Sequence, residues 1–241
     1  MRRPARLAFL APCIAAGVLA LGEPAPRIER GAHVVSVAAG SIGLADERPA
    51  PRDRREIQRT LQQQAAGTYI GEMLLERDSS LARWPDRVEQ PVRVWVAATS
   101  DVPGWTTGLA DQVRDAFRTW GATGIPVRFT FVSDSASAEV HVRWTDRFSE
   151  PISGRTRWAR DDGWWITDAV ITLAVHHHGG EPLDEEATHA MALHEIGHLL
   201  GLDHTADAAS IMAPRVRVRA LGAVDRATAR LLYRLPAGSI R

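Results

Sequence analysis

The sequence contains no lysine and only one cysteine. Its 29 basic residues are all arginine and are matched by 29 acidic residues, so the 241-residue chain has a formal net charge of zero. A protein without a basic excess has no general attraction for nucleic acid or for an anionic membrane surface, and we expect no nucleic-acid partner. The single thiol, Cys13, lies near the N-terminus, so the rest of the chain has no cysteine with which to form a disulfide.

Long apolar runs are also missing, apart from one at the N-terminus. There, Arg2, Arg3 and Arg6 precede an apolar run over residues 7–21. This run is shorter than the roughly 20 residues that a membrane-spanning helix needs. A charged start followed by a short apolar stretch is typical of a secretory signal peptide. We therefore predict a signal peptide over residues 1–22, no stable membrane span, and a secreted (extracellular or periplasmic) protein. An uncleaved anchor and a lipid attached at Cys13 remain alternatives.

Residues 23–85 are predicted to form a linker or pro-like segment with one helix. Residues 23–52 are rich in proline, arginine, alanine and glycine and show no sustained periodicity. Apolar residues then recur at helical spacing from Asp53 to Glu76, with Gly67 as the point where the helix would break. We expect this helix to brace the domain that follows, and a removable prodomain is the alternative.

The remaining chain, residues 86–241, shows strand and helix patterns that follow one another without an internal repeat. Alternating apolar residues predict strands at 92–96, 127–132 and 138–144, and a hairpin of 155–160 and 164–175 around a turn at 161–163. Helical spacing predicts helices at 105–120, 183–200 and 225–233.

The most informative stretch is residues 194–204, His-Glu-Ile-Gly-His-Leu-Leu-Gly-Leu-Asp-His. Positions four apart lie on one helical face, so His194 and His198 can present two imidazoles to one ion. Gly201 permits the turn that would bring His204 to the same ion. Three nitrogen ligands leave a fourth position for water, which is typical of catalytic zinc. We predict one Zn²⁺ bound by these three histidines.

Glu195 follows the first of these histidines and is the predicted catalytic residue. A carboxylate beside a zinc-bound water can take its proton and later protonate the leaving amine. The alternative is an amphipathic helix whose histidines are only polar surface. A second run, residues 176–178, is three histidines in a row, for which we favour an exposed loop over a second metal site.

The motif resembles the HExxHxxGxxH sequence of the metzincins. Ser210-Ile211-Met212 resembles the methionine turn of the matrixins within that group. The resemblance implies that Met212 forms a hydrophobic floor under the three imidazoles, and that Asp225 belongs to the C-terminal helix. It also implies that residues 169–173 belong to the substrate-binding edge region.

Two features depart from the matrixin pattern. A matrixin prodomain carries a cysteine that caps the zinc, and the only cysteine here lies within the predicted signal peptide. The sequence also contains no recognisable calcium loop, so calcium is possible but not supported.

Together, the resemblance and the order of elements imply an α+β, metzincin-like domain over residues 86–241. We expect a twisted, mostly parallel sheet with packed helices and a small C-terminal subdomain. The implied function is a secreted zinc-dependent endopeptidase acting on a protein or peptide substrate. The alternatives are a zinc hydrolase of a non-protein amide, such as a cell-wall cross-link, and a non-catalytic zinc-binding module. Neither the substrate-binding residues nor the oligomeric state can be predicted from the sequence.

Overall fold

The computed structural model describes residues 33–34 and 54–240. The predicted signal peptide, and residues 23–32 and 35–53 of the predicted linker, lie outside the described residues. Among the helices of the described part, none is long and apolar enough to cross a membrane.

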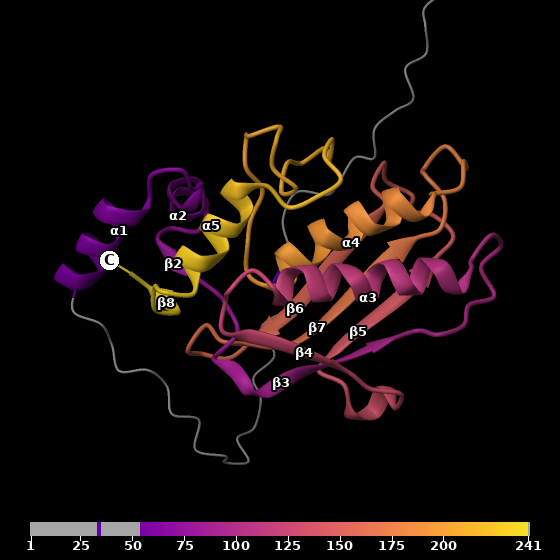
Figure 1. The fold of residues 1–241 in the computed structure, drawn as a ribbon, viewed down its shortest axis with the longest axis horizontal. Coiled ribbons are helices and arrows are strands. Elements are labelled where there is room, and N and C mark those ends of the chain that lie inside the picture. Colours follow the sequence, from indigo (N-terminus) through magenta and orange to yellow (C-terminus); the bar gives the residue numbers. More distant parts are fainter. Residues whose placement is uncertain (1–32, 35–53, 241) are drawn as a thin grey trace, which may run out of the picture.

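A six-stranded twisted sheet lies at the centre of the molecule (Figure 1). Its strand order is β1-β6-β7-β5-β3-β4, and within the sheet only β6 and β7 pair antiparallel. The prediction of a mostly parallel sheet is therefore confirmed. The strands are β1 (His33–Val34), β3 (Arg87–Val96), β4 (Val127–Phe131), β5 (Val140–Thr145), β6 (Gly154–Arg160) and β7 (Ile166–Ala174).

The hairpin between β6 and β7 decides which strand lies toward the sheet edge. Its turn is closed by the Asp161 carboxylate, which accepts hydrogen bonds from the backbone N–H groups of Gly163 (2.8 Å) and Trp165 (3.1 Å). The hairpin places β6 on the outer side of β7, so residues 169–173 lie in an interior strand between β5 and β6. The expectation that residues 169–173 belong to the substrate-binding edge region is therefore wrong, because their strand is interior. Strand β6 lies outside β7, and the two-residue strand β1 pairs with β6 only at Arg157 and Trp158.

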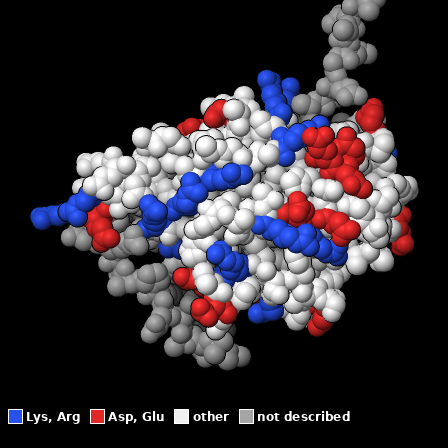
Figure 2. Space-filling model, in the orientation of Figure 1, with Lys and Arg blue, Asp and Glu red and all other residues white. Residues whose placement is uncertain are grey.

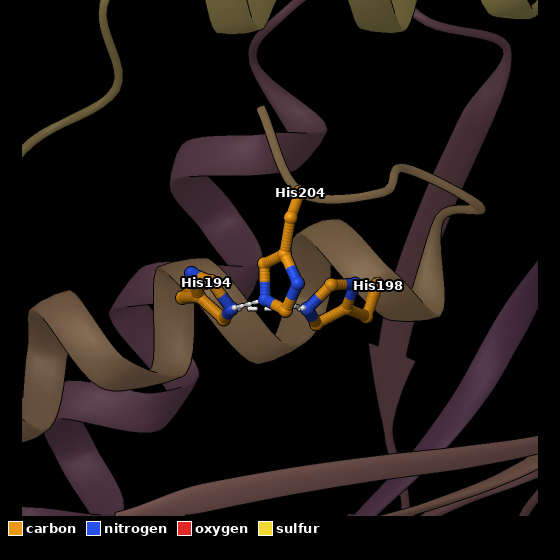
Figure 3. Close-up of side chains that lie close together, drawn as sticks. All are labelled: His194, His198 and His204. Carbon is orange, nitrogen blue, oxygen red and sulfur yellow. Dashed lines mark hydrogen bonds between the residues drawn. The ribbon is translucent and has the colours of Figure 1, made fainter. Parts of the chain in front are cut away.

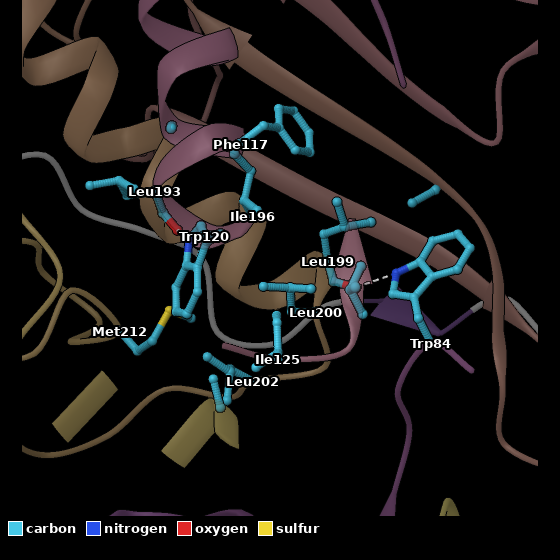
Figure 4. Packing of buried hydrophobic residues seen from close by; sticks show 14 of the residues in the cluster. Trp84, Phe117, Trp120, Ile125, Leu193, Ile196, Leu199, Leu200, Leu202 and Met212 are labelled. Carbon is cyan, nitrogen blue, oxygen red and sulfur yellow. Dashed lines mark hydrogen bonds between the residues drawn. The ribbon is translucent and has the colours of Figure 1, made fainter. Parts of the chain in front are cut away.

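Two helices, α3 (Thr107–Gly121) and α4 (Glu185–Leu199), lie side by side over one face of the sheet (Figure 1). Helix α3 buries the face predicted from its spacing, including Phe117 and Trp120. The Trp120 indole Nε1–H donates to the carbonyl of Leu193 at 2.8 Å and so ties the two helices together (Figure 4).

Helix α4 is buried on nearly every side. Twelve of its 15 residues are buried, because α3, the sheet and the following loop surround it. The helix begins after Asp184, whose carboxylate accepts from the Ala187 N–H as an N-cap. It ends before Gly201, which has φ +95°. A Cβ at Gly201 would lie 2.1 Å from the Ala82 carbonyl oxygen, so this turn requires glycine both for its conformation and for space.

A second group of elements packs at one end of the sheet (Figure 1). The segment predicted as one helix forms two, α1 (Arg54–Gln64) and α2 (Ile70–Glu76). Helix α2 contacts the C-terminal helix α5 (Ala223–Leu232). The short strands β2 (Ser80–Leu81) and β8 (Gly238–Ser239) pair antiparallel beside them. A short 3₁₀ helix, η1 (Ser135–Ser137), links β4 to β5.

Charged side chains of both signs are interspersed over the face shown in Figure 2. Several are paired, for example Glu139 with Arg87 and, at 3.4 Å, with Arg93. Neither sign dominates this face, as expected for a chain with no net charge.

Candidate metal centre

Three imidazoles converge at the C-terminal half of α4 (Figure 3). His194 and His198 lie one turn apart on the helix, and His204 reaches them from the loop after Gly201. Their Nε2 atoms lie 2.9 Å (His194–His198), 3.2 Å (His198–His204) and 3.3 Å (His194–His204) apart. The sequence motif therefore brings together the three residues that it predicts. Within the described residues this is the only group of three or more potential ligands close enough to hold one ion.

The chemistry of the three nitrogens fits a cation. Nδ1 of His194 lies 2.7 Å from the Ile211 carbonyl, and Nδ1 of His198 lies 2.9 Å from the Leu202 carbonyl. A carbonyl oxygen can only accept, so both Nδ1 atoms carry the proton and both Nε2 atoms present lone pairs. Facing lone pairs repel unless a positive ion lies between them. Nitrogens bound to one tetrahedral zinc at about 2.0–2.1 Å are roughly 3.3 Å apart, so the group fits zinc.

Burial keeps His194 and His198 neutral. His194 is fully buried and His198 is 3% exposed. Burial lowers the pKa of His198 to about 4. Burial, and then the neighbouring His198 and His204, lower the pKa of His194 well below its usual value. A metal ligand must be the neutral imidazole, and near pH 7 these two side chains are in that form.

The Glu195 side chain points from α4 toward the start of β6. Thr156 Oγ1 lies 2.6 Å from Glu195 Oε2 and 2.9 Å from the Glu195 main-chain oxygen, and its single proton is shared between these two acceptors, of which Oε2 is the nearer. A Cβ at Gly154 would lie 2.5 Å from Glu195 Oε1, so the carboxylate occupies space that only glycine leaves open. Strand β6 therefore holds one carboxylate oxygen and makes room for the other. Sequence reasoning singled out neither Gly154 nor Thr156, because both lie about 40 positions from the motif and carry no local signal.

Met212 lies beneath α4, completely buried (Figure 4). Its Sδ approaches Gly197, and a Cβ built at Gly197 would also contact Trp120, so Met212 packs into the core between α3 and α4. The turn that carries Met212 is held by the fully buried Asp225 carboxylate of α5. That carboxylate accepts from Ser210 Oγ, the Ile211 N–H (3.2 Å) and the Gly222 N–H (2.7 Å). The network continues to the metal site, since Ile211 also accepts from His194.

The histidine run at 176–178 contributes nothing to this centre. His176 is half-buried and its Nδ1 lies 2.8 Å from an Asp146 carboxylate oxygen, while His178 Nδ1 contacts the Phe148 carbonyl at 3.1 Å. The run is a surface loop in which His178 is exposed, whereas His176 is partly covered and forms a bridge with Pro182. A second metal site at this run has no group of three ligands to support it among the described residues.

Comparison with known families agrees with this arrangement. The family model of the matrixins, a peptidase family, matches residues 98–233, which is more than half of the chain. The match includes the three histidines, the methionine turn and α5, whereas α1 and α2 lie outside it. The chain is a member of the matrixin family of zinc metallopeptidases.

Proposed function

We propose that this matrixin is a secreted zinc-dependent endopeptidase in which Glu195 is the general base. The observation that carries the proposal is the joint placement, on one buried helix turn, of two convergent imidazoles and a hydrogen-bonded carboxylate. Secretion rests on the sequence of residues 1–22 alone, which lie outside the described residues.

The chemistry follows from the positions of the side chains. Zinc held by His194, His198 and His204 supplies a Lewis acid that polarises a peptide carbonyl and lowers the pKa of water to about 7. Glu195 accepts a proton from the attacking water as the new C–O bond forms, and returns a proton to the amine nitrogen as the C–N bond breaks. Thr156 keeps the carboxylate in place during both transfers, through its hydrogen bond to Oε2.

An extended peptide is the substrate that the site favours over other amides. Strand β6 lies on the outer side of the sheet, and its first residues, Gly154–Thr156, contact the Glu195 side chain. Among the described residues, β1 pairs with β6 only further along, at Arg157 and Trp158. A strand edge offers backbone N–H and C=O groups at regular intervals, which suits recognition of a peptide main chain by strand addition. We propose that substrate binds along β6.

The first test compares wild type with Glu195→Ala for zinc content and for cleavage of casein or a peptide library. Because Glu195 is not a ligand, the variant should keep one zinc per chain and lose activity by at least about 10²-fold. Glu186→Gln, an exposed acid in the first turn of the same helix, is the matched control and should cut like wild type.

Other outcomes separate the alternatives. A wild-type protein that binds zinc but cuts only cell-wall material supports the non-protein amide hydrolase. A protein that binds zinc and cuts no substrate supports the non-catalytic module. Wild type without zinc contradicts the proposal altogether.

A further inference from the structure

The third histidine of the centre is held differently from the other two. His194 and His198 are fixed by α4, but residues 202–205, around His204, form neither helix nor strand. His204 is also the only partly exposed member of the group. A ligand in such a loop needs contacts from outside the motif to hold its position, because a 1 Å error in a metal ligand is costly.

Those contacts come from α2 and the residue that follows it. The Arg77 guanidinium pairs with the carboxylate of Asp203, the residue before His204. Asp203 is 7% exposed, so this is a largely buried ion pair. On the other side of His204, the Glu72 carboxylate accepts from Thr205 Oγ1 at 3.0 Å and from the Ala206 N–H at 2.9 Å. The backbone on both sides of the third ligand is thus held by two side chains five residues apart in the chain.

Helix α2 is itself fixed to the body of the domain. The Tyr69 N–H donates to Thr228 Oγ1 of α5 at 3.1 Å, and Ile70 and Met73 belong to the main hydrophobic core. The chain then passes behind the end of α4, where the Ala82 carbonyl packs against Gly201. Trp84 Nε1–H donates to the Leu199 carbonyl at 3.0 Å (Figure 4). Along residues 69–84, the chain therefore contacts first the His204 loop and then the end of α4.

We propose that Glu72 and Arg77 are positioning residues for the third zinc ligand, and that residues 54–85 are a permanent part of the catalytic unit. Any cleavage during maturation then falls before Arg54, although the family match begins only at residue 98. Replacing Arg77 alone would leave the largely buried Asp203 carboxylate without its counter-charge, and such a loss is strongly destabilising. The proposal rests on the proposed function, since it assumes that the histidines bind zinc.

The test measures zinc affinity of the full chain by competition with a chromophoric chelator. Glu72→Ala and Arg77→Met should each raise the Kd for zinc by on the order of 10-fold, because outer residues that orient ligands typically carry that much affinity. The matched control is Glu76→Ala, which changes an exposed carboxylate on the same helix and should alter the Kd by less than about twofold. Circular dichroism of the zinc-free proteins shows whether each variant is folded.

Conservative variants keep the test decisive if a truncated side chain prevents folding. Arg77→Lys keeps the charge and Glu72→Gln keeps one acceptor oxygen, so both should fold and bind zinc with intermediate affinity. Folded variants at Glu72 and Arg77 with wild-type zinc affinity would overturn the proposal even if the protein is an active peptidase. Wild type that binds no zinc would overturn both proposals, whereas zinc binding without peptide cleavage would leave this one intact.

Limited trypsin digestion of the zinc-loaded full chain tests whether residues 54–85 are a permanent part of the folded domain. Arginine at 77, 83 and 87 offers trypsin sites in the segment that would have to be cut to release α1 and α2. We expect these bonds to be protected and the stable fragment to retain α2. A cut after Arg77 or Arg83 that leaves a folded, zinc-bound remainder would show that the segment is removable.

Discussion

Single residues show how far the motif alone determines the site. The three ligands follow from local spacing, because a helix and one glycine turn are enough to bring His194, His198 and His204 together. The carboxylate of Glu195 is different, since its orientation depends on β6. Thr156 and Gly154 approach it from about 40 residues away along the chain. No periodicity in the sequence marks such a long-range contact, so these two residues could be found only from the structure.

Thr156→Val tests the contribution of the hydroxyl to the site. Valine has nearly the same shape but no donor, so Glu195 Oε2 loses its 2.6 Å hydrogen bond. We expect kcat to fall on the order of 10-fold or more, since losing a partner of a buried charged group costs about 1–3 kcal/mol. KM and zinc content should change little. Steady-state kinetics with metal analysis measure both.

Thr156→Ser is the matched control, because serine restores the donor without the methyl group. Its kcat should return close to the wild-type value. If valine and serine reduce kcat equally, the side chain acts through packing and not through its hydrogen bond to Glu195.

For the helices and strands, the sequence predicts that an element exists more reliably than it predicts which other elements that element contacts. Helix α4 has almost no apolar stripe, yet Asp184 and Gly201 mark its two ends within about two residues. The apolar spacing of residues 53–76 predicts one helix, with Gly67 as the point where it would break. In the structure it divides into α1 and α2, and the Tyr69 N–H bonds to Thr228 of α5 instead of continuing α1. Gly67, with φ +74°, lies between the two helices where the sequence allowed a break, and the tertiary contact fixes the direction of α2.

The methionine turn is held to α5 by the Asp225 carboxylate, which is another tertiary contact. The substitution Asp225→Ala tests how much this contact contributes to stability. The alanine leaves two buried donors, on Ser210 and Ile211, and a half-buried donor on Gly222 without their acceptor. We expect the free energy of unfolding to fall by on the order of 3 kcal/mol or more. Urea denaturation of the zinc-free protein measures this loss without a contribution from metal binding.

The controls for this change use the same helix. Asp225→Asn keeps the shape and one acceptor oxygen and should cost less than alanine. Arg226→Ala replaces an exposed neighbour and should change stability by less than about 0.5 kcal/mol. Equal losses for alanine at 225 and at 226 would mean that the buried carboxylate does not hold the turn.

For the whole molecule, the fold class and the order of helices and strands could be predicted from the sequence. The residue at which the folded domain begins could not. Alternating and helical patterns predicted the strands and helices of residues 86–241, and the mostly parallel sheet was implied by resemblance. The packing of residues 54–85 against α4 and α5 depends on contacts such as Trp84 with Leu199. The strand order, with β6 outside β7, depends likewise on which strands meet in space. Neither the packing of residues 54–85 nor the strand order produces a periodic pattern in the sequence.

One large core runs from α1 to the C-terminal part of the described domain, beside a small separate cluster around Phe148, and its extent determines what zinc removal should do. Buried apolar residues from Ile57 in α1 to Leu235 near the C-terminus belong to one cluster, which includes Met212. A core of this extent does not depend on a metal, unlike that of a zinc finger, which unfolds without its ion. We expect the chelated protein to lose activity, keep its far-UV circular dichroism and melt at a lower temperature.

The size of the shift follows from mass action. Zinc at 100 times its Kd stabilises the folded state by about 2.7 kcal/mol. For a domain of this size, 1 kcal/mol shifts Tm by roughly 2–4 °C, so removing zinc should lower Tm by about 5–11 °C. Calorimetry with chelator, and again after zinc is restored, measures the shift and its reversal. Unfolding on chelation at room temperature would mean that the three facing lone pairs cost more free energy than the core supplies.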